Sequence, residues 1–197
     1  MARLAVLCLL LLGTGSLHGE GAWGPGIQVA VTAPANSTLR YVAGAPGFGL
    51  GIHDTWAIPG RSDRNLIRPR ADYAQYLETT QTSSLEGLSQ AIHAQLSSLS
   101  LGADYLCRIS GSRSRLYGGL GISEIRWAVA SRNVVTAPQG GSVTLTGTAH
   151  WWRLGLGPVV NWRVSEQLVA EARVTFSRYD QQNLPANTGS IGLLWHF

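Results

Sequence analysis

Apolar and polar residues alternate with a period of two along most of the chain beyond residue 24. This period places successive side chains on opposite faces of an extended strand, and it does not suit an α-helix. Several alternating segments exceed ten residues, which is long for a soluble sheet but normal for a tilted strand that crosses a membrane. We therefore predict eight strands, over residues 26–33, 47–56, 66–77, 95–108, 116–130, 148–162, 168–179 and 187–197.

The links between these segments alternate between long and short. In chain order they are 34–46, 58–65, 78–94, 109–115, 131–147, 163–167 and 180–186. Short periplasmic turns and longer extracellular loops are the asymmetry of an outer-membrane barrel. The links thus predict an all-β fold, an eight-stranded antiparallel transmembrane up-and-down β-barrel with both termini periplasmic. Residues 83–95 also allow a short amphipathic helix, which is the alternative for that link.

The N-terminus has the plan of a secretory signal peptide. Arg3 supplies one early positive charge, residues 4–12 are apolar, and small residues follow at 13–16. The apolar run is too short for a membrane-spanning helix, which needs about 20 residues. We expect residues 1–20 to be cleaved off, at a site between 16 and 22, and residues 21–197 to form one barrel. Cys107 would then be the single cysteine, so no intramolecular disulfide is expected.

Each predicted strand can be tested for an apolar outer face and a polar inner face. Six segments, the second, third, fourth, sixth, seventh and eighth, pass this test. The fifth does not, because Glu124 and Arg126 have the same parity as the apolar residue Leu120. We predict a bulge near Gly121 that switches the face of this strand.

The inner faces collect charged side chains. An eight-stranded barrel has room inside for side chains and little else, so we predict a lumen plugged by salt bridges and glycines rather than an open pore. Asp104 could pair with Arg68 or Arg70, and Arg153 with Glu171. The predicted lumen charge network comprises Arg68, Arg70, Asp72, Asp104, Arg108, Arg153, Glu171 and Arg173.

Aromatic residues cluster near the predicted strand ends, as expected for two interfacial girdles that flank an apolar band. The alternative is that they are core residues of a soluble β-protein. The predicted periplasmic girdle comprises Trp56, Tyr105, Tyr117, Trp162, Trp195 and Phe197. The predicted outer girdle comprises Phe48, Trp127, Trp152 and Phe176.

The last eight residues carry a further motif. Ser190, Gly192, Trp195 and the terminal Phe197 resemble the C-terminal β-signal of outer-membrane proteins: polar, any, glycine, any, any, hydrophobic, any, terminal aromatic. The resemblance implies recognition by the barrel-assembly machinery, with periplasmic chaperones as partners during biogenesis.

Four internal phrases, at 47–51, 68–73, 101–105 and 117–121, resemble the OmpA/OmpX-like outer membrane protein beta-barrel domain family. This resemblance covers essentially the whole mature chain and implies an architecture rather than an activity. Pro69 departs from an ideal strand, because proline cannot donate a ladder hydrogen bond. We therefore expect an edge-like gap or a bulge at Pro69.

Several function classes find no support in the sequence. All 15 basic residues are arginine, and they are dispersed rather than gathered into the basic stripe of a nucleic-acid surface. No Cys/His/Asp cluster has metal-ligand spacing, and no cofactor is expected. His150 could serve as the base of a lipid-A-modifying enzyme, but the next residue on its face is Trp152 rather than a serine.

The sequence therefore predicts a non-enzymatic integral outer-membrane protein with an envelope-structural or surface-interaction role. Outer-membrane lipid and lipopolysaccharide are its expected partners, and a monomer is expected. The alternatives are a lipid-A-modifying enzyme, a narrow small-solute channel, and a soluble periplasmic barrel that binds an apolar ligand inside.

Overall fold

The computed structural model describes residues 23–43, 46–58, 64–85, 87–109, 115–179 and 184–197. The predicted signal peptide (1–20) and its cleavage region (16–22) lie outside the described residues. Within the described ranges no helix is both long and apolar enough to cross a membrane.

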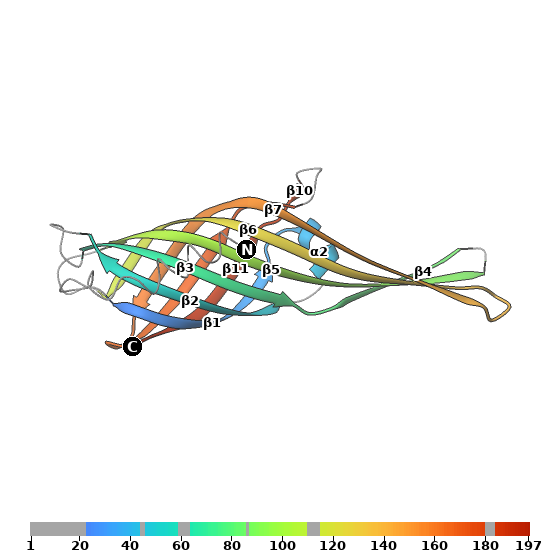
Figure 1. Ribbon diagram of the computed structural model, residues 1–197, viewed down its shortest axis with the longest axis horizontal. Helices are drawn as coiled ribbons and strands as arrows, with labels where there is room; N and C mark the ends of the chain where they lie inside the picture. Colours follow the sequence, from blue (N-terminus) through green and yellow to red (C-terminus); the bar gives the residue numbers. More distant parts are fainter. Residues whose placement is uncertain (1–22, 44–45, 59–63, 86, 110–114, 180–183) are drawn as a thin grey trace.

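Eight antiparallel strands form the barrel that the alternation predicts (Figure 1). They hydrogen-bond in the order β3-β2-β1-β11-β8-β7-β6-β5, and a pairing between β3 and β5 closes the ring. The barrel strands are β1 (Gly24–Pro34), β2 (Gly47–Ala57), β3 (Asn65–Tyr76), β5 (Leu88–Arg108), β6 (Leu116–Thr136), β7 (Ser142–Arg163), β8 (Leu168–Thr175) and β11 (Thr188–His196).

The strands are staggered around the barrel. Following paired residues once around the ring leads from Trp162 on β7 back to Trp152 on the same strand, ten residues away. A stagger of this size over eight strands corresponds to a tilt of roughly 40°. The residues passed on the way are Ala170, Leu193, Val29, Leu50, Tyr73, Leu99 and Arg126.

The register of β6 is continuous, so the predicted bulge near Gly121 is wrong. Its pairings with β5 and β7 run without interruption from Leu116 to Thr136. Inward-facing residues such as Ser123 are buried, and Glu124 and Arg126 lie on the opposite, outer face. Glu124 and Arg126 therefore lie on the same outer face as Leu120 and Ile122 of this strand.

A gap interrupts the ladder between β2 and β3, as expected from Pro69. The paired residues jump from His53 and Arg70 to Trp56 and Ile67, and Pro69 lies within the skipped interval. Proline has no N–H to donate to the neighbouring strand, so the ladder opens at this point.

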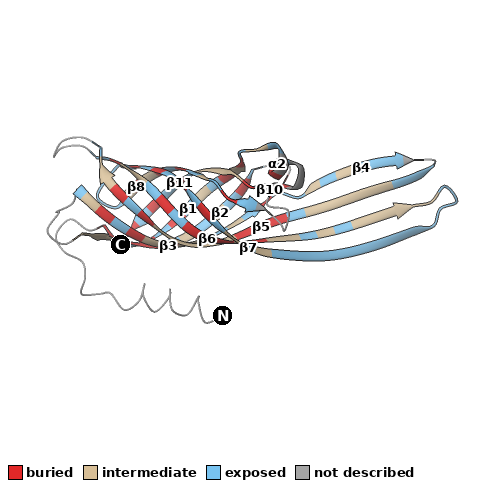
Figure 2. Cartoon of the chain, turned by 90° about the horizontal axis from the view of Figure 1, so that it is seen from above, coloured by how far each residue is buried: buried red, intermediate tan, exposed pale blue. Residues whose placement is uncertain are grey.

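Three barrel strands continue beyond the barrel as a projecting sheet (Figure 2). It consists of β4 (Thr79–Leu85), residues 88–97 of β5, 128–136 of β6 and 142–151 of β7. The predicted loops at 78–94 and 131–147 are thus wrong, and so is the alternative of a helix over 83–95. These segments contain many Ser, Thr and Gln residues, and their apolar alternation is limited to short runs such as Val143 and Leu145. Threonine nevertheless favours strands, and each hairpin supplies a complete ladder.

A short helix and a small hairpin cover the barrel mouth at the same end. Helix α2 (Ser37–Ala43) follows β1, and the hairpin joins β9 (Arg178–Tyr179) to β10 (Leu184–Pro185). The Asn36 side chain links them, because it donates a hydrogen bond to Pro185 O at 2.8 Å and accepts one from Asn187 N at 3.0 Å. The mouth is therefore held closed by contacts between segments that are distant in sequence.

Candidate functional site

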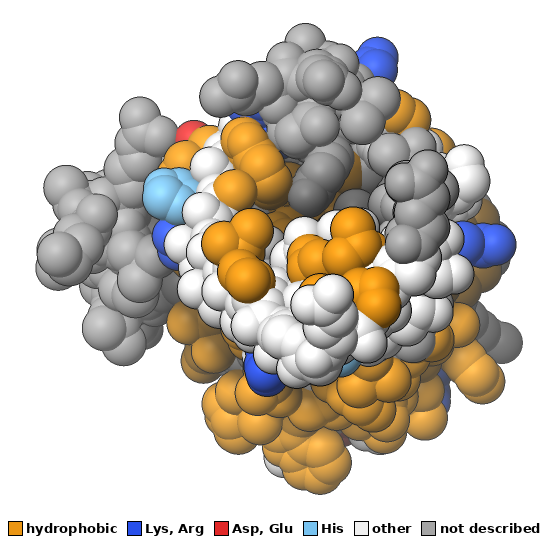
Figure 3. All heavy atoms as spheres, turned by 90° about the vertical axis from the view of Figure 1, so that its right-hand side faces the viewer, with side chains coloured by type: hydrophobic (Ala, Val, Ile, Leu, Met, Phe, Trp, Pro, Cys, Tyr) orange, Lys and Arg blue, Asp and Glu red, His pale blue; other side chains and the backbone are white. Residues whose placement is uncertain are grey.

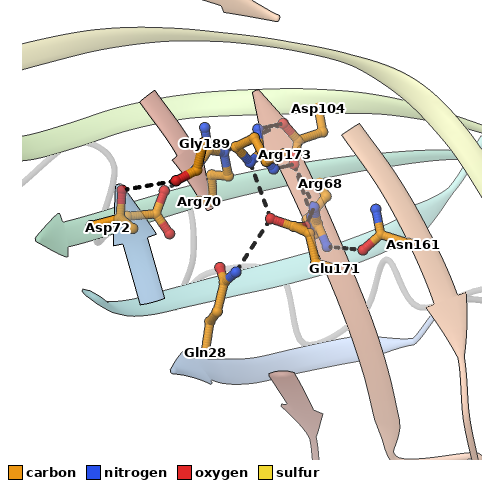
Figure 4. A network of polar contacts seen from close by, with 10 residues as sticks. Gln28, Arg68, Arg70, Asp72, Asp104, Asn161, Glu171, Arg173 and Gly189 are labelled. Carbon is orange, nitrogen blue, oxygen red and sulfur yellow. Dashed lines mark hydrogen bonds and ion pairs between the residues drawn. The ribbon is translucent and has the colours of Figure 1, made fainter. Parts of the chain in front are cut away.

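A network of buried ions fills the middle of the lumen (Figure 4). Asp104 is its centre and accepts hydrogen bonds from two arginines. Arg173 binds it through both terminal nitrogens, with Nη1 2.8 Å from Oδ1 and Nη2 2.7 Å from Oδ2. Arg68, which is paired directly with Asp104 across β3 and β5, reaches Oδ2 from Nε at 3.0 Å and from Nη2 at 2.7 Å.

A second carboxylate completes the core of the network. Glu171 pairs with Arg68, accepts a hydrogen bond from Arg173 Nε at 3.0 Å, and accepts another from Gln28 Nε2 at 3.2 Å. Arg68 also donates to Asn161 Oδ1 at 3.0 Å. Each charged group therefore has several partners, which is the condition under which buried ions are tolerated.

The network is electrically balanced. Arg70 pairs with Asp72, and its Nε lies 3.3 Å from Asp104 Oδ1. Three arginines (68, 70 and 173) thus face three carboxylates (72, 104 and 171). A charge-balanced plug avoids the cost of an uncompensated charge away from water.

The structure brings together six of the eight predicted network residues and leaves two outside. The predicted pair of Asp104 with Arg68 or Arg70 is present. The predicted pair of Arg153 with Glu171 is wrong, because the contacts of Glu171 are with Arg68, Arg173 and Gln28, and Arg153 donates to Trp152 O. Arg108 instead donates to the Tyr117 hydroxyl at 2.9 Å and lies over its ring.

Sequence reasoning missed the two amides of the network, Gln28 and Asn161. Both are buried and have the inward parity of their strands. Because neither is charged, a search for lumen ions does not find them. An inward amide beside inward charges is the signal that could have found them.

Glycines make room for the network. A Cβ on Gly121 would lie 2.4 Å from Asp104 Oδ1 and 2.6 Å from Arg173 Nη1. A Cβ on Gly51 would lie 2.4 Å from Asp72 Oδ1. These distances are shorter than van der Waals contact, so the arginines and carboxylates can meet only across positions without a side chain.

Two apolar layers enclose the network along the barrel axis. The α2-end layer consists of Leu39, Ala43, Tyr76, Leu96, Ile125, Trp127 and Ala186. The termini-end layer consists of Trp23, Leu66, Leu106, Tyr117, Val159, Val169 and Leu194. Helix α2 contributes to the first layer by placing Leu39 and Ala43 inside the mouth.

Two aromatic residues of these layers correct the predicted girdles. Trp127 and Tyr117 are each only 1% exposed and face the lumen, so their assignment to the outer girdle and the periplasmic girdle, respectively, is wrong. Trp127 packs near Tyr76, and Tyr117 meets Trp23 edge to face at 4.9 Å. Both lie near the ends of the predicted strand 116–130, which is why proximity to an end alone misplaced them.

The remaining girdle residues lie on the outer wall. Trp56 is partly buried, and the others are exposed. At the termini end these are Tyr105, Trp162, Trp195 and Phe197, and toward the other end they are Phe48, Trp152 and Phe176. Seen from the end of the projecting sheet, hydrophobic side chains cover much of the visible barrel wall (Figure 3).

A small cavity lies between the ion network and the α2-end layer. Its volume is about 80 Å³, and its lining includes Arg70, Asp72, Tyr76, Ser98 and Thr32. It has room for a few water molecules. Among the described residues, the two apolar layers lie on either side of the network and of this cavity.

The residues of the C-terminal motif lie on or beside the closing strand β11. This strand pairs with β1 and β8, and Trp195 and Phe197 point outward. Gly192 faces inward, where a Cβ would lie 3.0 Å from Gln28 Nε2. In this chain the motif glycine therefore also leaves space for a partner of Glu171.

The other candidate chemistry is sparse. His150 is exposed on β7, paired with Ala128 of β6. No group of three or more His, Cys, Asp or Glu side chains with the geometry of a metal site occurs among the described residues.

A closed antiparallel barrel with an apolar wall and a charged, plugged interior defines the class of transmembrane β-barrels. The N-terminal β-barrel domain of Pseudomonas aeruginosa OprF has the same fold, with a TM-score of 0.55 and 13% sequence identity over 91% of this chain and 100% of that domain. The chain therefore has the fold of a small bacterial outer-membrane β-barrel protein.

Other solved structures match over similar lengths. Ail of Yersinia pestis is 12% identical with a TM-score of 0.47, over 91% of this chain and all of Ail. A major outer membrane protein from Thermus thermophilus is 13% identical with a TM-score of 0.49, over 87% of this chain and 99% of that one. No protein-family model matches the sequence, and no curated protein matches it.

Proposed function

We propose that the protein is a non-enzymatic integral outer-membrane β-barrel that anchors the projecting sheet at the cell surface, where the sheet interacts with other molecules. Both termini would be periplasmic. The observation that carries this proposal is the combination of a lumen filled by apolar layers and a charge-balanced ion network with a large sheet that the barrel does not cover.

The projecting sheet has the properties of an interaction surface. Among the described residues, strand β4 pairs only with β5, and residues 142–154 of β7 pair only with β6, so the sheet has two edges without a described neighbour. The face that continues the lumen carries Val143 and Leu145, each 61% exposed, and Leu88. Open edges and exposed apolar side chains are both sites at which another chain can bind.

The side-chain-filled lumen argues for an anchor rather than a channel. A solute would have to pass the two apolar layers and the ion network between them. Planar-bilayer recordings of the purified protein test this point. We expect no steady conductance, and single-channel steps would instead support the small-solute channel.

The lipid-A-modifying enzyme remains the other candidate. On its own strand His150 has Thr148 and Trp152 as neighbours on the same face, which offers no activated nucleophile with an orienting acid. Mass spectrometry of lipid A from cells with and without the gene decides the question. The proposal expects identical profiles, and a shifted acyl or phosphate pattern would contradict it.

Biogenesis would follow the route of outer-membrane barrels. We propose export through the N-terminal signal peptide, escort by periplasmic chaperones, and insertion by the barrel-assembly machinery through Ser190, Gly192, Trp195 and Phe197. The inserted protein would be a monomer in contact with outer-membrane lipid and lipopolysaccharide, with no nucleic-acid partner.

Membrane fractionation and cysteine labelling of whole cells test location and orientation together. In a Cys107→Ser background, Thr144→Cys lies in the projecting sheet and Ser165→Cys in a turn at the termini end. A membrane-impermeant maleimide should label Thr144→Cys in intact cells and Ser165→Cys only after permeabilisation. A protein in the soluble fraction, or the reverse labelling, would overturn the proposal.

A further inference from the structure

Two charged side chains interrupt the apolar outer wall of the barrel on one strand. Glu124 and Arg126 of β6 face outward, in line with Leu120 and Ile122 below them. Arg126 is paired with Leu99 on β5 and with Trp152 on β7, and Trp152 belongs to the aromatic residues nearest the projecting sheet. The arginine thus lies at the level where the apolar wall ends.

The same face of the same strands continues upward as a polar groove. The groove has a volume of about 570 Å³, and its lining includes His93, Gln95, Arg132, Thr146 and Thr148. These five residues and Ala130 have the outward parity of their strands, whereas Ser131 and Gly147, which also line the groove, have the inward parity. The groove therefore lies mainly on the outer face of the projecting sheet. Its hydroxyl, amide and imidazole groups suit the hydroxyl groups of a sugar.

Arg126 and the groove lie one after the other along strand β6, in the direction of the projecting sheet. Arg132 lies six residues beyond Arg126 on β6, a separation of roughly 20 Å along the strand. Between them the outward positions of β6 are the small residues Ala128 and Ala130, which leave space beside the strand. Neither guanidinium has an ion-pair partner within the described part of the chain.

We propose that this outer face of β5, β6 and β7 binds one molecule of a phosphorylated glycolipid of the outer leaflet, that is, lipopolysaccharide. Arg126 binds a phosphate of its lipid anchor, with the acyl chains against the apolar wall below. Its anionic core sugars occupy the groove, where Arg132 binds them. The assignment rests on the proposed function, because it requires the projecting sheet to stand outside the cell.

The chemistry of Arg126 and the groove favours this ligand over others. Arginine binds phosphate through a planar fork of donors, and an amphipathic residue such as Trp152 is favoured at the boundary between acyl chains and headgroups. A glycolipid has acyl chains, then a phosphate, then sugars. This order matches the apolar wall, Arg126 and the polar groove along the strand. Glu78 is the acidic group of the groove, and it lies 2.9 Å from His93 Nδ1.

Binding of a defined glycolipid to the refolded protein in zwitterionic detergent micelles tests the proposal. The probes are a fluorescent lipid A that carries its two innermost core sugars and the same molecule with its phosphates removed. Phosphatidylglycerol and inorganic phosphate serve as competitors. We expect Arg126→Gln and Arg132→Gln each to weaken binding of the phosphorylated probe about tenfold, the effect of losing one charge-assisted hydrogen bond.

The matched control is Arg115→Gln, which removes an exposed arginine at the opposite end of the barrel. This variant should bind like the unaltered protein, and all variants should keep heat-modifiable mobility, which reports a folded barrel. Competition by phosphatidylglycerol or by inorganic phosphate should be weak, because neither molecule supplies both anchor and sugars.

Three results would overturn the inference. The first is equal affinity for the phosphorylated and dephosphorylated probes, and the second is an equal loss in Arg115→Gln. The third is a dimer that Arg126→Gln dissolves without any change in glycolipid binding, which would assign the wall charges to a contact between copies. Each of these outcomes leaves whole-cell labelling unchanged, so failure here is distinguishable from failure of the proposed function.

Discussion

Strands β5, β6 and β7 each pass through two regions, the barrel and the projecting sheet (Figure 2), and on β7 the polarity of the outward residues reverses between them. On β7 the outward residues Leu154 and Leu156 are apolar within the barrel, whereas Thr146 and Thr148 on the same face are polar above it. The register continues without a bulge. The reversal therefore reflects a change of surroundings, from lipid to water on the outside.

The two regions also differ in how they are stabilised. In the barrel, each inner charge depends on partners from several strands, and the space around them is filled. In the projecting sheet the residues are mostly exposed or half-buried, and the stability comes mainly from the ladders between neighbouring strands. Equivalent substitutions in the two regions should therefore have unequal effects.

The largest difference is expected for acidic residues. Asp104→Ala leaves Arg68, Arg70 and Arg173 without their shared partner, and we expect a loss of about 3–5 kcal/mol in the free energy of unfolding. Glu78→Ala, which removes an exposed partner of His93, should cost less than about 1 kcal/mol. Urea unfolding of both variants in lipid vesicles measures these values, and similar losses would show that the lumen network does not dominate stability.

Charges placed on apolar residues should give the next largest difference. Leu156→Arg puts a charge on the apolar barrel wall and should cost about 2–4 kcal/mol, because the guanidinium would face hydrocarbon. Leu145→Arg places the same charge on an exposed residue of the projecting sheet and should change stability little. The comparison fails if the two variants unfold at the same urea concentration.

Glycine substitutions should give the smallest of the three differences. A Cβ on Gly121 would press on Asp104 and Arg173, so Gly121→Ala should cost about 1–3 kcal/mol through overpacking. On Gly147 the nearest atom to a Cβ is Ser131 Oγ at 3.6 Å, an ordinary contact, so Gly147→Ala should be nearly neutral. An equal effect of both changes on the urea midpoint would contradict this account of the lumen glycines.

The barrel was predictable because its two faces meet different surroundings. Long alternating segments and links of alternating length indicated eight barrel strands, and the inward parity of Arg68 and Asp104 indicated their pairing. The projecting sheet was not predictable in the same way. Its segments 79–84 and 142–148 carry mostly Ser, Thr, Gln and Gly with few apolar residues, so they resemble loops although their backbones pair fully.

The errors in the site have a common physical cause. Trp127 and Tyr117 were assigned by their closeness to strand ends, although their parity places them in the lumen. The predicted bulge near Gly121, which would place Glu124 and Arg126 inside, depends on the assumption that the outer wall is apolar along its whole length. Inferring three-dimensional neighbours such as Gln28 and Glu171 required the register around the ring, which the sequence does not specify between distant strands.

The change of surroundings along β7 is the central claim, and a spin-label scan tests it most directly. Single cysteines at 146, 148, 150, 154, 156 and 160, in a Cys107→Ser background in lipid bilayers, carry a nitroxide whose collisions with oxygen and with a water-soluble nickel complex are measured. We predict nickel access at 146–150 and oxygen access, typical of lipid, from 154 to 160. Nickel access at 154–160 would contradict the account, because the wall would then face water.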